Sequence, residues 1–401
     1  MILVADRIIT GDGKTILENG AVCVLDGKIA AVGDAAGLRD KHPRMSVREY
    51  PGATIMPGLI DMHVHIGFWR SQSDARSFND FKIAYLAADY VKKAFAKGVT
   101  TIRDVSSPKN LCASINYAAG KGYIEAPRII STDAAICFTG GHAWAGGSIE
   151  ADGPWAVRAA IRDNIKRGAQ WVKIMASHRT DTPEFTREEL EAAVDEAHRV
   201  GKKVAVHAGT QPSIQMCIDA GFDTIEHGTH MTIEQARQMA EKGLVWCPTI
   251  AAYTRTYEFI LENMNKQDID STGSSFVADH DYFRDAATAY KDNFKKLYET
   301  GVKIVAGTDI IYNNSPATPI AWEMKYMAEY GMPPLEVIMA ATKSGAETLS
   351  IGDITGEIAV GKQADIVVVA GNPLVDIGVM EHVTETYLAG KPVYQNSERN
   401  G

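Results

Sequence analysis

Short apolar runs alternate with amphipathic helical patterns through the middle of the chain. Eight runs, bounded by turn residues, have the continuity of buried strands: LIDMHVHI, VTTIRDV, RIISTDAA, WVKIMA, KVAVHAG, FDTIEHG, LVWCPTI and VKIVAGTD. Two of the helical stretches begin with a capping box, Thr186 with Glu189 and Thr232 with Gln235. Continuous apolar strands that alternate with helices indicate a parallel sheet covered by helices. The pattern therefore predicts an α/β fold, a (β/α)8 TIM barrel over residues 57–352. A doubly wound open sheet is the alternative, but no GxGxxG motif follows any of the strands.

The two ends of the chain have a different pattern. Runs such as ILVADRIIT near the start and HVTETYLAGKPVY near the end read as strands joined by glycine turns, and Asp12-Gly13 and Asp26-Gly27 are hairpin signals. We expect residues 1–56 and 353–401 to form one small β-sandwich domain built from both termini. The region from Tyr253 to about Asp281 has no clear pattern, and we expect a long loop there that acts as an active-site lid.

Charge and composition narrow the classes of function. The net charge of -9 and the absence of any basic run argue against a nucleic-acid partner. The sequence has no signal-peptide pattern and no apolar window of about 18 residues, so neither secretion nor a membrane span is expected. Five scattered cysteines without a CxxC pair favour a reducing, cytoplasmic location over a disulfide framework.

Titratable side chains stand near the carboxyl ends of five predicted strands. Each one alone is ordinarily a hydrogen-bonded, solvated or turn residue, but in a barrel the carboxyl ends of strands meet at one site. His63 and His65 lie on the same face of their strand, and neutral imidazole binds zinc well. Asp61 lies on that face too, and we interpret it as a residue that supports the ligands. The candidate ligands are His63, His65, Lys173, His207, His227 and Asp309.

Lys173 is the unexpected member of this set, because an ammonium group repels cations. A carbamate formed from its amine and carbon dioxide would instead be an anionic bridge. Two-metal hydrolytic sites hold their ions about 3.5–4 Å apart, a distance that such a bridge spans. The sequence therefore predicts two divalent metal ions and an N6-carboxylated Lys173.

These motifs, taken together, resemble the amidohydrolase superfamily and, within it, the metal-dependent dipeptidases of the Xaa-Pro (prolidase-like) and Xaa-Arg/Lys kinds. The matching stretches include PGLIDMHVHIG, TGGHAW, VKIMAS, VAVHAG, IEHGT, GTD and GEIAVGKQADIVVVAGNPL, in family order over nearly the whole chain. The resemblance implies a binuclear, usually zinc, centre. It places His63, His65, Lys173 and Asp309 around the more buried ion, and Lys173, His207 and His227 around the more exposed one.

The resemblance also implies a mechanism. A hydroxide that bridges the metals would attack an amide carbonyl in a dipeptide or N-acyl amino acid, with Asp309 as general base and then acid. His142 and Tyr253 are the candidate substrate-binding residues, as donors to the oxyanion or the substrate carboxylate. One departure puts the inherited substrate in question: after strand four the chain continues as His178-Arg179-Thr180-Asp181, in place of a Gly-Gly-rich loop.

Other functions stay open at this point. Hydrolysis of a cyclic or xenobiotic amide or ester, such as an imidazolone, lactam or imide, would use the same site. Lys173 disfavours the mononuclear enzymes that act on such rings. A non-enzymatic scaffold on this fold is disfavoured because all six ligand positions are filled. By analogy with its relatives, the protein is expected to be a homo-oligomer.

Overall fold

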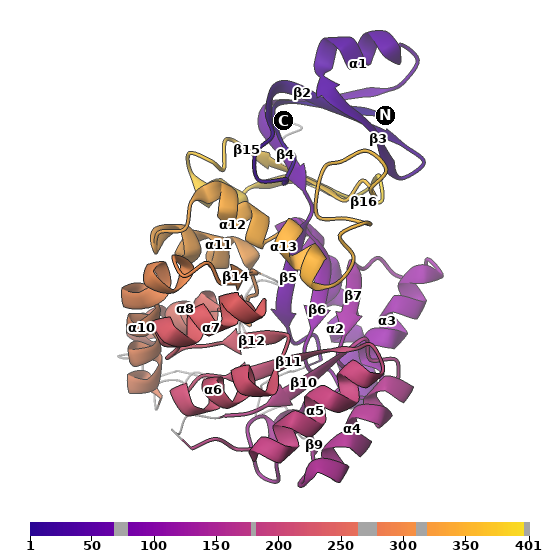
Figure 1. The fold of residues 1–401 in the computed structure, drawn as a ribbon. Helices are drawn as coiled ribbons and strands as arrows, with labels where there is room; N and C mark the ends of the chain where they lie inside the picture. Colours follow the sequence, from indigo (N-terminus) through magenta and orange to yellow (C-terminus); the bar gives the residue numbers. More distant parts are fainter. Residues whose placement is uncertain (68–78, 178–181, 264–278, 310–318, 397–401) are drawn as a thin grey trace.

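The chain folds into parallel sheets from its middle and a separate sheet from its two ends (Figure 1). The computed structural model describes residues 1–67, 79–177, 182–263, 279–309 and 319–396. The predicted loop at His178 to Asp181 lies outside these residues.

The middle of the chain forms two parallel sheets. The first has the strand order β5 (Leu59–Val64), β6 (Val99–Asp104) and β7 (Arg128–Ser131). The second has the order β14 (Lys303–Ile304), β13 (Val245–Cys247), β12 (Thr224–His227), β11 (Lys203–Ala208), β10 (Trp171–Met175), β8 (Ile136–Cys137) and β9 (Ile149–Glu150). Each of the eight predicted runs contains one of these strands, so the expectation of parallel strands alternating with helices is confirmed.

Backbone hydrogen bonds also join the two parallel sheets to each other. At one edge, the amide of Met62 in β5 donates to the carbonyl of Ala306, just after β14, at 2.9 Å. At the other edge, the amide of Gln170, just before β10, donates to the carbonyl of Ser131 in β7 at 2.7 Å. These two bonds link β5 to the segment after β14, and β7 to the segment before β10.

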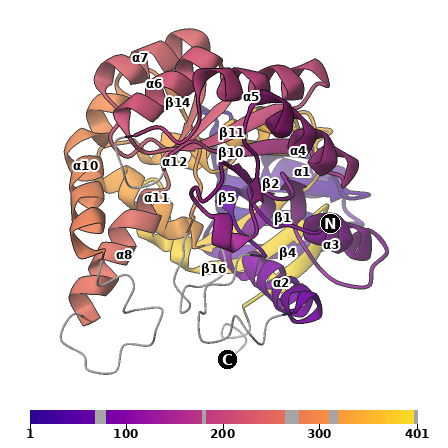
Figure 2. The same ribbon diagram turned by 90° about the horizontal axis from the view of Figure 1, so that it is seen from below.

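Helices lie around these strands, as the view from below shows (Figure 2). Every residue of β5, β6 and β10 is buried, which explains why their sequences are apolar runs and not alternating patterns. Among the described residues, the α-helices outside the terminal sheet are α2 (Asp80–Ala94), α3 (Leu111–Gly120), α4 (Pro154–Lys166), α5 (Arg187–Arg199), α6 (Gln211–Ala220), α7 (Ile233–Lys242), α8 (Ile250–Asn263), α10 (His280–Tyr298), α11 (Ile320–Glu329), α12 (Pro334–Ala340) and α13 (Lys343–Thr348).

Two of these helices begin as the sequence predicts. Thr186 and Glu189 form a complete capping box on α5, and Thr232 and Gln235 form one on α7. The expected irregular region from Tyr253 to about Asp281 is wrong at its start, because α8 continues to Asn263; residues 264–278 of the expected lid lie outside the described residues. The side chains of Ile250, Tyr253 and Ile260 are buried along α8, so packing stabilises helix where the sequence shows no clear period.

Strands from both ends of the chain share one seven-stranded sheet. Its order is β17 (Lys391–Gln395), β16 (Val383–Leu388), β15 (Ile366–Ala370), β4 (Val47–Pro57), β1 (Ile2–Ile9), β2 (Ile16–Leu25) and β3 (Lys28–Asp34), with α1 (Ala35–Lys41) beside it. β15 lies antiparallel to β4, with Val368 opposite Ile55. The Asp26-Gly27 turn joins β2 to β3 with positive φ at both residues, as the hairpin signal predicts.

This terminal sheet contacts the rest of the chain through polar bonds. The hydroxyl of Thr386 in β16 donates to the carbonyl of Phe95 at 2.8 Å, and Arg128 pairs with the buried carboxylate of Asp365 at 3.1 Å. β4 leads into β5 with only Gly58 between them. The terminal sheet is therefore anchored next to the strand that carries His63.

Candidate metal centre

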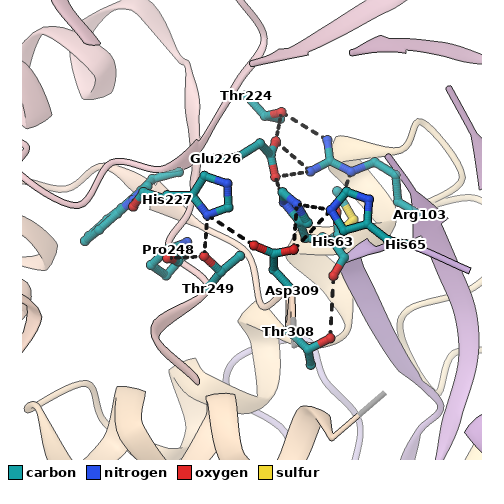
Figure 3. A network of polar contacts seen from close by, with 12 residues as sticks. His63, His65, Arg103, Thr224, Glu226, His227, Pro248, Thr249, Thr308 and Asp309 are labelled. Carbon is teal, nitrogen blue, oxygen red and sulfur yellow. Dashed lines mark hydrogen bonds and ion pairs between the residues drawn. The ribbon is translucent and has the colours of Figure 1, made fainter. Parts of the chain in front are cut away.

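Side chains from β5 and from the segment that follows β14 meet at one polar cluster (Figure 3). Nε2 of His65 lies 3.0 Å from Oδ1 of Asp309, and Nε2 of His63 lies 3.6 Å from the same oxygen. The two Nε2 atoms are 3.3 Å apart. The amide of Asp309 donates to the carbonyl of His63 at 3.0 Å, so pairing of the chain after β14 with β5 brings the carboxylate to the histidines.

Histidines from the neighbouring strands extend this cluster. Nδ1 of His227, at the end of β12, lies 3.8 Å from Oδ2 of Asp309. The rings of His227 and His207, from β11, have centroids 4.3 Å apart. Ligand atoms of His63, His227 and Asp309 all lie within 4.8 Å of one another, so these three can bind one ion together.

Both predicted substrate-binding residues border the cluster. The His142 ring lies 4.2 Å from the His207 ring, centroid to centroid. The Tyr253 ring meets the His227 ring edge-on at 5.7 Å. Tyr253 comes from the first turn of α8, and His142 from the loop between β8 and β9. The structure thus brings every candidate residue of the sequence into one region.

Lys173 on β10 is fully buried, close enough for its charge to lower the pKa of His63, His207 and His227. Its Nζ atom has no hydrogen-bond partner among the described residues, whereas buried polar atoms in proteins are normally paired. Burial lowers the pKa of this amine to about 8; the Glu226 charge opposes the shift and the Arg103 charge adds to it. A buried amine without a partner fits a lysine whose nitrogen carries a further group.

The protonation states of the cluster suit a cation. Burial lowers the pKa of His63 to about 4 and those of His207 and His227 well below the usual value, so these imidazoles are neutral. Burial opposes ionisation of Asp309, but the nearby His63 and His65 rings outweigh it and lower the pKa of the carboxyl. Neutral imidazoles around one carboxylate are the donor set that zinc and similar ions take.

The backbone at two candidate ligands is strained. His227 has φ +67° and Asp309 has φ +40°, in the left-handed region that few non-glycine residues adopt. Gly307 explains the close approach of this segment, since a Cβ there would lie 2.5 Å from Sγ of Cys247 and 2.7 Å from Cβ of His63. Strain of this kind persists where packing imposes it, and here it directs both side chains to the cluster.

Asp61 supports the site through hydrogen bonds. It is not one of the three residues, His63, His227 and Asp309, whose ligand atoms lie within 4.8 Å of one another. Its carboxylate accepts hydrogen bonds from the Thr308 hydroxyl at 2.8 Å, from the Thr308 amide at 3.1 Å and from the His63 amide at 3.2 Å. Burial raises the pKa of Asp61 to about 7, against these hydrogen bonds. The contacts fix the turn before Asp309 to β5, in line with the supporting role read from the sequence.

Sequence reasoning missed two residues that contact Nδ1 atoms of the candidate histidines. Nδ1 of His63 lies 2.7 Å from Oε2 of Glu226, and Nδ1 of His227 lies 2.7 Å from Oγ1 of Thr249. Burial opposes ionisation of Glu226, but the charge of Arg103 outweighs it and keeps the pKa well below its usual value. The available signal was a pair of opposite charges, Arg103 and Glu226, inside two apolar strand sequences.

Comparison with known proteins identifies the class. Residues 54–393 match the Amidohydrolase family, and the chain belongs to it. Residues 20–44 also match the imidazolonepropionase-like composite domain of bacteria. The chain is therefore a hydrolase that acts on amide bonds.

Individual relatives place it in the dipeptidase-like branch. The chain is 29% identical to the ochratoxinase of Aspergillus niger, over 97% of this chain and 86% of that protein, and the crystal structure of that enzyme superposes with a TM-score of 0.84. A crystal structure of a Xaa-Pro dipeptidase with bound methionine is 30% identical with a TM-score of 0.85, covering 98% of this chain and 99% of the other. The imidazolonepropionase of Halobacterium salinarum is 25% identical over 90% of this chain and 87% of its own.

Across the described part of the chain, none of the helices combines the length and the apolar character needed to span a lipid bilayer.

Proposed function

We propose that this chain is a binuclear metal-dependent amidohydrolase that cleaves the amide bond of a dipeptide or an N-acyl amino acid. The observation that carries the proposal is the cluster of neutral histidines and Asp309 around the buried, unpaired amine of Lys173. The family membership of the chain supports amide hydrolysis as the chemistry.

The proposed scaffold is a closed (β/α)8 barrel over residues 57–352, with a β-sandwich made from residues 1–56 and 353–401. Hydrogen bonds from Met62 to Ala306 and from Gln170 to Ser131 support closure. The pairing of β15 with β4 supports a terminal domain made from both ends. In such a barrel the catalytic groups stand at the carboxyl ends of the strands.

The proposed ligands divide into two sets that share Lys173. His63, His65 and Asp309 would hold one ion and His207 and His227 the other, both completed by Lys173 in its carboxylated form. The uncharged amine of Lys173 adds to the carbon of carbon dioxide and loses a proton, which gives an anionic N-carboxylate with two oxygens. Two divalent ions, for which zinc is proposed, would supply a nucleophilic hydroxide at neutral pH and polarise the scissile carbonyl when bound.

Three side chains act on the substrate in this scheme. Ionised Asp309 accepts the proton of the attacking water and passes it to the leaving nitrogen. Burial raises the pKa of Tyr253 well above its usual value, so its phenol stays protonated and donates a hydrogen bond. His142, over the His207 ring, is the second proposed donor to the oxyanion or the substrate carboxylate.

The relatives guide the choice of substrate. The Xaa-Pro dipeptidase and the ochratoxinase that resemble this chain do so over nearly its full length. The test is kcat/KM across a panel of dipeptides and N-acyl amino acids, with the zinc-loaded protein and with the metal measured per chain. We expect turnover of part of this panel at two ions per chain. Turnover confined to cyclic substrates, or one ion per chain in a fully active enzyme, would overturn the proposal.

A second candidate is hydrolysis of a cyclic or xenobiotic amide or ester at the same site. The match of residues 20–44 and the 25% identity to an imidazolonepropionase favour it. Imidazolone, lactam and imide substrates in the same panel separate the two functions.

A further inference from the structure

A buried ion pair lies directly behind the proposed metal ligand His63. Arg103 on β6 and Glu226 on β12 are both fully buried, and Nη2 of Arg103 lies 2.7 Å from each oxygen of Glu226. Figure 3 shows the carboxylate of Glu226 between the guanidinium and the His63 ring. Neither residue belongs to the candidate ligand set of the sequence.

The guanidinium of Arg103 is held from several sides. Its Nε donates to the carbonyl of Met62 at 2.6 Å, and its Nη1 donates to the hydroxyl of Thr224 at 3.0 Å. Its central carbon lies 4.9 Å from the centroid of the Trp171 ring. These contacts come from β5, β12 and β10, so they fix the position of Arg103 and, through it, of Glu226. So many specific contacts on one buried charge indicate a defined geometry.

The arrangement determines which nitrogen of His63 carries the proton. A carboxylate that accepts from arginine can only accept, so its contact with Nδ1 of His63 at 2.7 Å requires a proton on Nδ1. Nε2 then has a free electron pair, and this is the nitrogen 3.3 Å from His65 and 3.6 Å from Asp309. Ligating histidines in metal sites are commonly held in this way by a carboxylate.

We propose that Arg103 and Glu226 are positioning residues that fix the tautomer and ring orientation of His63, so that Nε2 is presented to the metal. The inference rests on the proposed metal-dependent function. Arg103 orders Glu226, Glu226 orders His63, and neither of the two contacts substrate. A purely structural pair would contribute to stability and leave metal affinity unchanged.

The first test measures the zinc dissociation constant of the full-length protein by competition with a chromophoric chelator. Glu226→Gln keeps the shape of the side chain, but its amide can donate as well as accept and so no longer selects one tautomer. We expect the dissociation constant to rise about 10- to 100-fold. The double variant Arg103→Met/Glu226→Gln, which leaves no unpaired buried charge, should show the same rise.

A matched control separates positioning from stability. Asp365→Asn removes the charge of another buried carboxylate, which pairs with the partly exposed Arg128 at 3.1 Å at the terminal sheet. It should lower the unfolding temperature and leave the zinc dissociation constant unchanged. Wild-type zinc affinity in both Glu226 variants, with only a loss of stability like that of Asp365→Asn, would overturn the inference.

A second measurement does not depend on whether a Glu226 variant folds. In the metal-free wild-type protein labelled with 15N-histidine, the ring of His63 should be protonated at Nδ1; its signals are assigned by their loss in His63→Asn. A ring protonated at Nε2 contradicts the inference. If the wild-type protein binds no zinc at all, the proposed function fails, while the tautomer still decides whether Glu226 orders His63.

Discussion

At the scale of single residues, the site is defined by protonation states that burial produces. His63, His207 and His227 lose the positive charge that they carry in water at low pH, and Asp309 retains its negative one. Burial lowers the pKa of Lys173 to about 8, so half of its amine is uncharged near that pH. The residue types were readable from the sequence, because each stands near the end of an apolar run.

Asp309→Asn tests the proton transfer. The amide keeps the shape and one oxygen of the carboxylate, so we expect both metal ions to remain bound. Amide hydrolysis should fall by about 10²–10⁴-fold, since the asparagine cannot accept the proton. Turnover is measured with the best substrate of the panel and metal content by elemental analysis. Near-normal turnover would remove Asp309 as the proton-transfer group.

Lys173→Ala tests the carboxylated lysine. We expect loss of bound metal and of activity, because the anionic bridge between the two ion sites is missing. Short carboxylic acids, which supply two oxygens without the side chain, should restore part of both. Full metal content in this variant, measured per folded chain, would refute the carbamate.

At the scale of elements, the start of α8 depends on a carboxylate from α11. Glu323 is fully buried, and its two oxygens accept from the amides of Ile250 at 3.0 Å and Ala251 at 2.7 Å. The contact caps the helix that carries Tyr253. Burial raises the pKa of Glu323 from 4.5 to about 8, with the hydrogen bonds of Ala251 and Ile250 opposing the shift.

Glu323→Gln tests this cap through the pH dependence of stability. A carboxyl whose pKa is higher in the folded state binds more protons there, so its contribution to stability is complete below about pH 4.5 and is lost as pH rises toward 8. The metal-free wild-type protein should therefore lose stability relative to Glu323→Gln between pH 5 and 8. Urea unfolding measures it.

The control for this prediction is Glu329→Gln on the same helix. Its side chain is half-exposed, and it pairs with Lys325 at 3.8 Å. The pH slope of the stability difference between Glu323→Gln and the wild type should exceed the slope found for this variant. A similar slope for both variants would place the effect elsewhere than at Glu323.

The sequence predicted the elements better than the contacts between them. Capping boxes and apolar runs are local, so the starts of α5 and α7 and the existence of the eight strands followed from spacing. Arg103 and Glu226 stand more than a hundred residues apart, and only the fold makes them partners. The helix over Ile250–Asn263 was missed because its burial depends on distant elements.

At the scale of the whole molecule, the terminal sheet needs both ends of the chain. β15 inserts between β16 and β4, and Ile366, Val367 and Val368 are fully buried. The opposing residues of β4, Ile55 and Met56, are fully buried as well. Ile55 from one end and Val368 from the other therefore pack in one core cluster that draws on both ends of the chain.

A chain that ends at Gly352 tests this dependence. It exposes one edge and the apolar side chains of β4, so we expect aggregation or loss of the cooperative unfolding transition. Size-exclusion chromatography and circular dichroism measure these outcomes. The control chain ends at Asn396, retains β17 and should behave as the full-length protein does. A monodisperse, cooperatively folded chain ending at Gly352 would show that β15–β17 are dispensable.

The pairing of β4 with β15 has a consequence for how the protein is made. Ribosomes deliver β4, and immediately afterwards the strand with His63 and His65, long before Ile366–Ala370 leaves the exit tunnel. During most of translation the nascent chain thus holds the two candidate ligands His63 and His65 next to a strand, β4, that lacks one of its two neighbours. Exposed apolar edges of this kind attract chaperones. We therefore expect the terminal sheet to close only after Ile366–Ala370 has been synthesised, and the proposed metal ions to bind after that step.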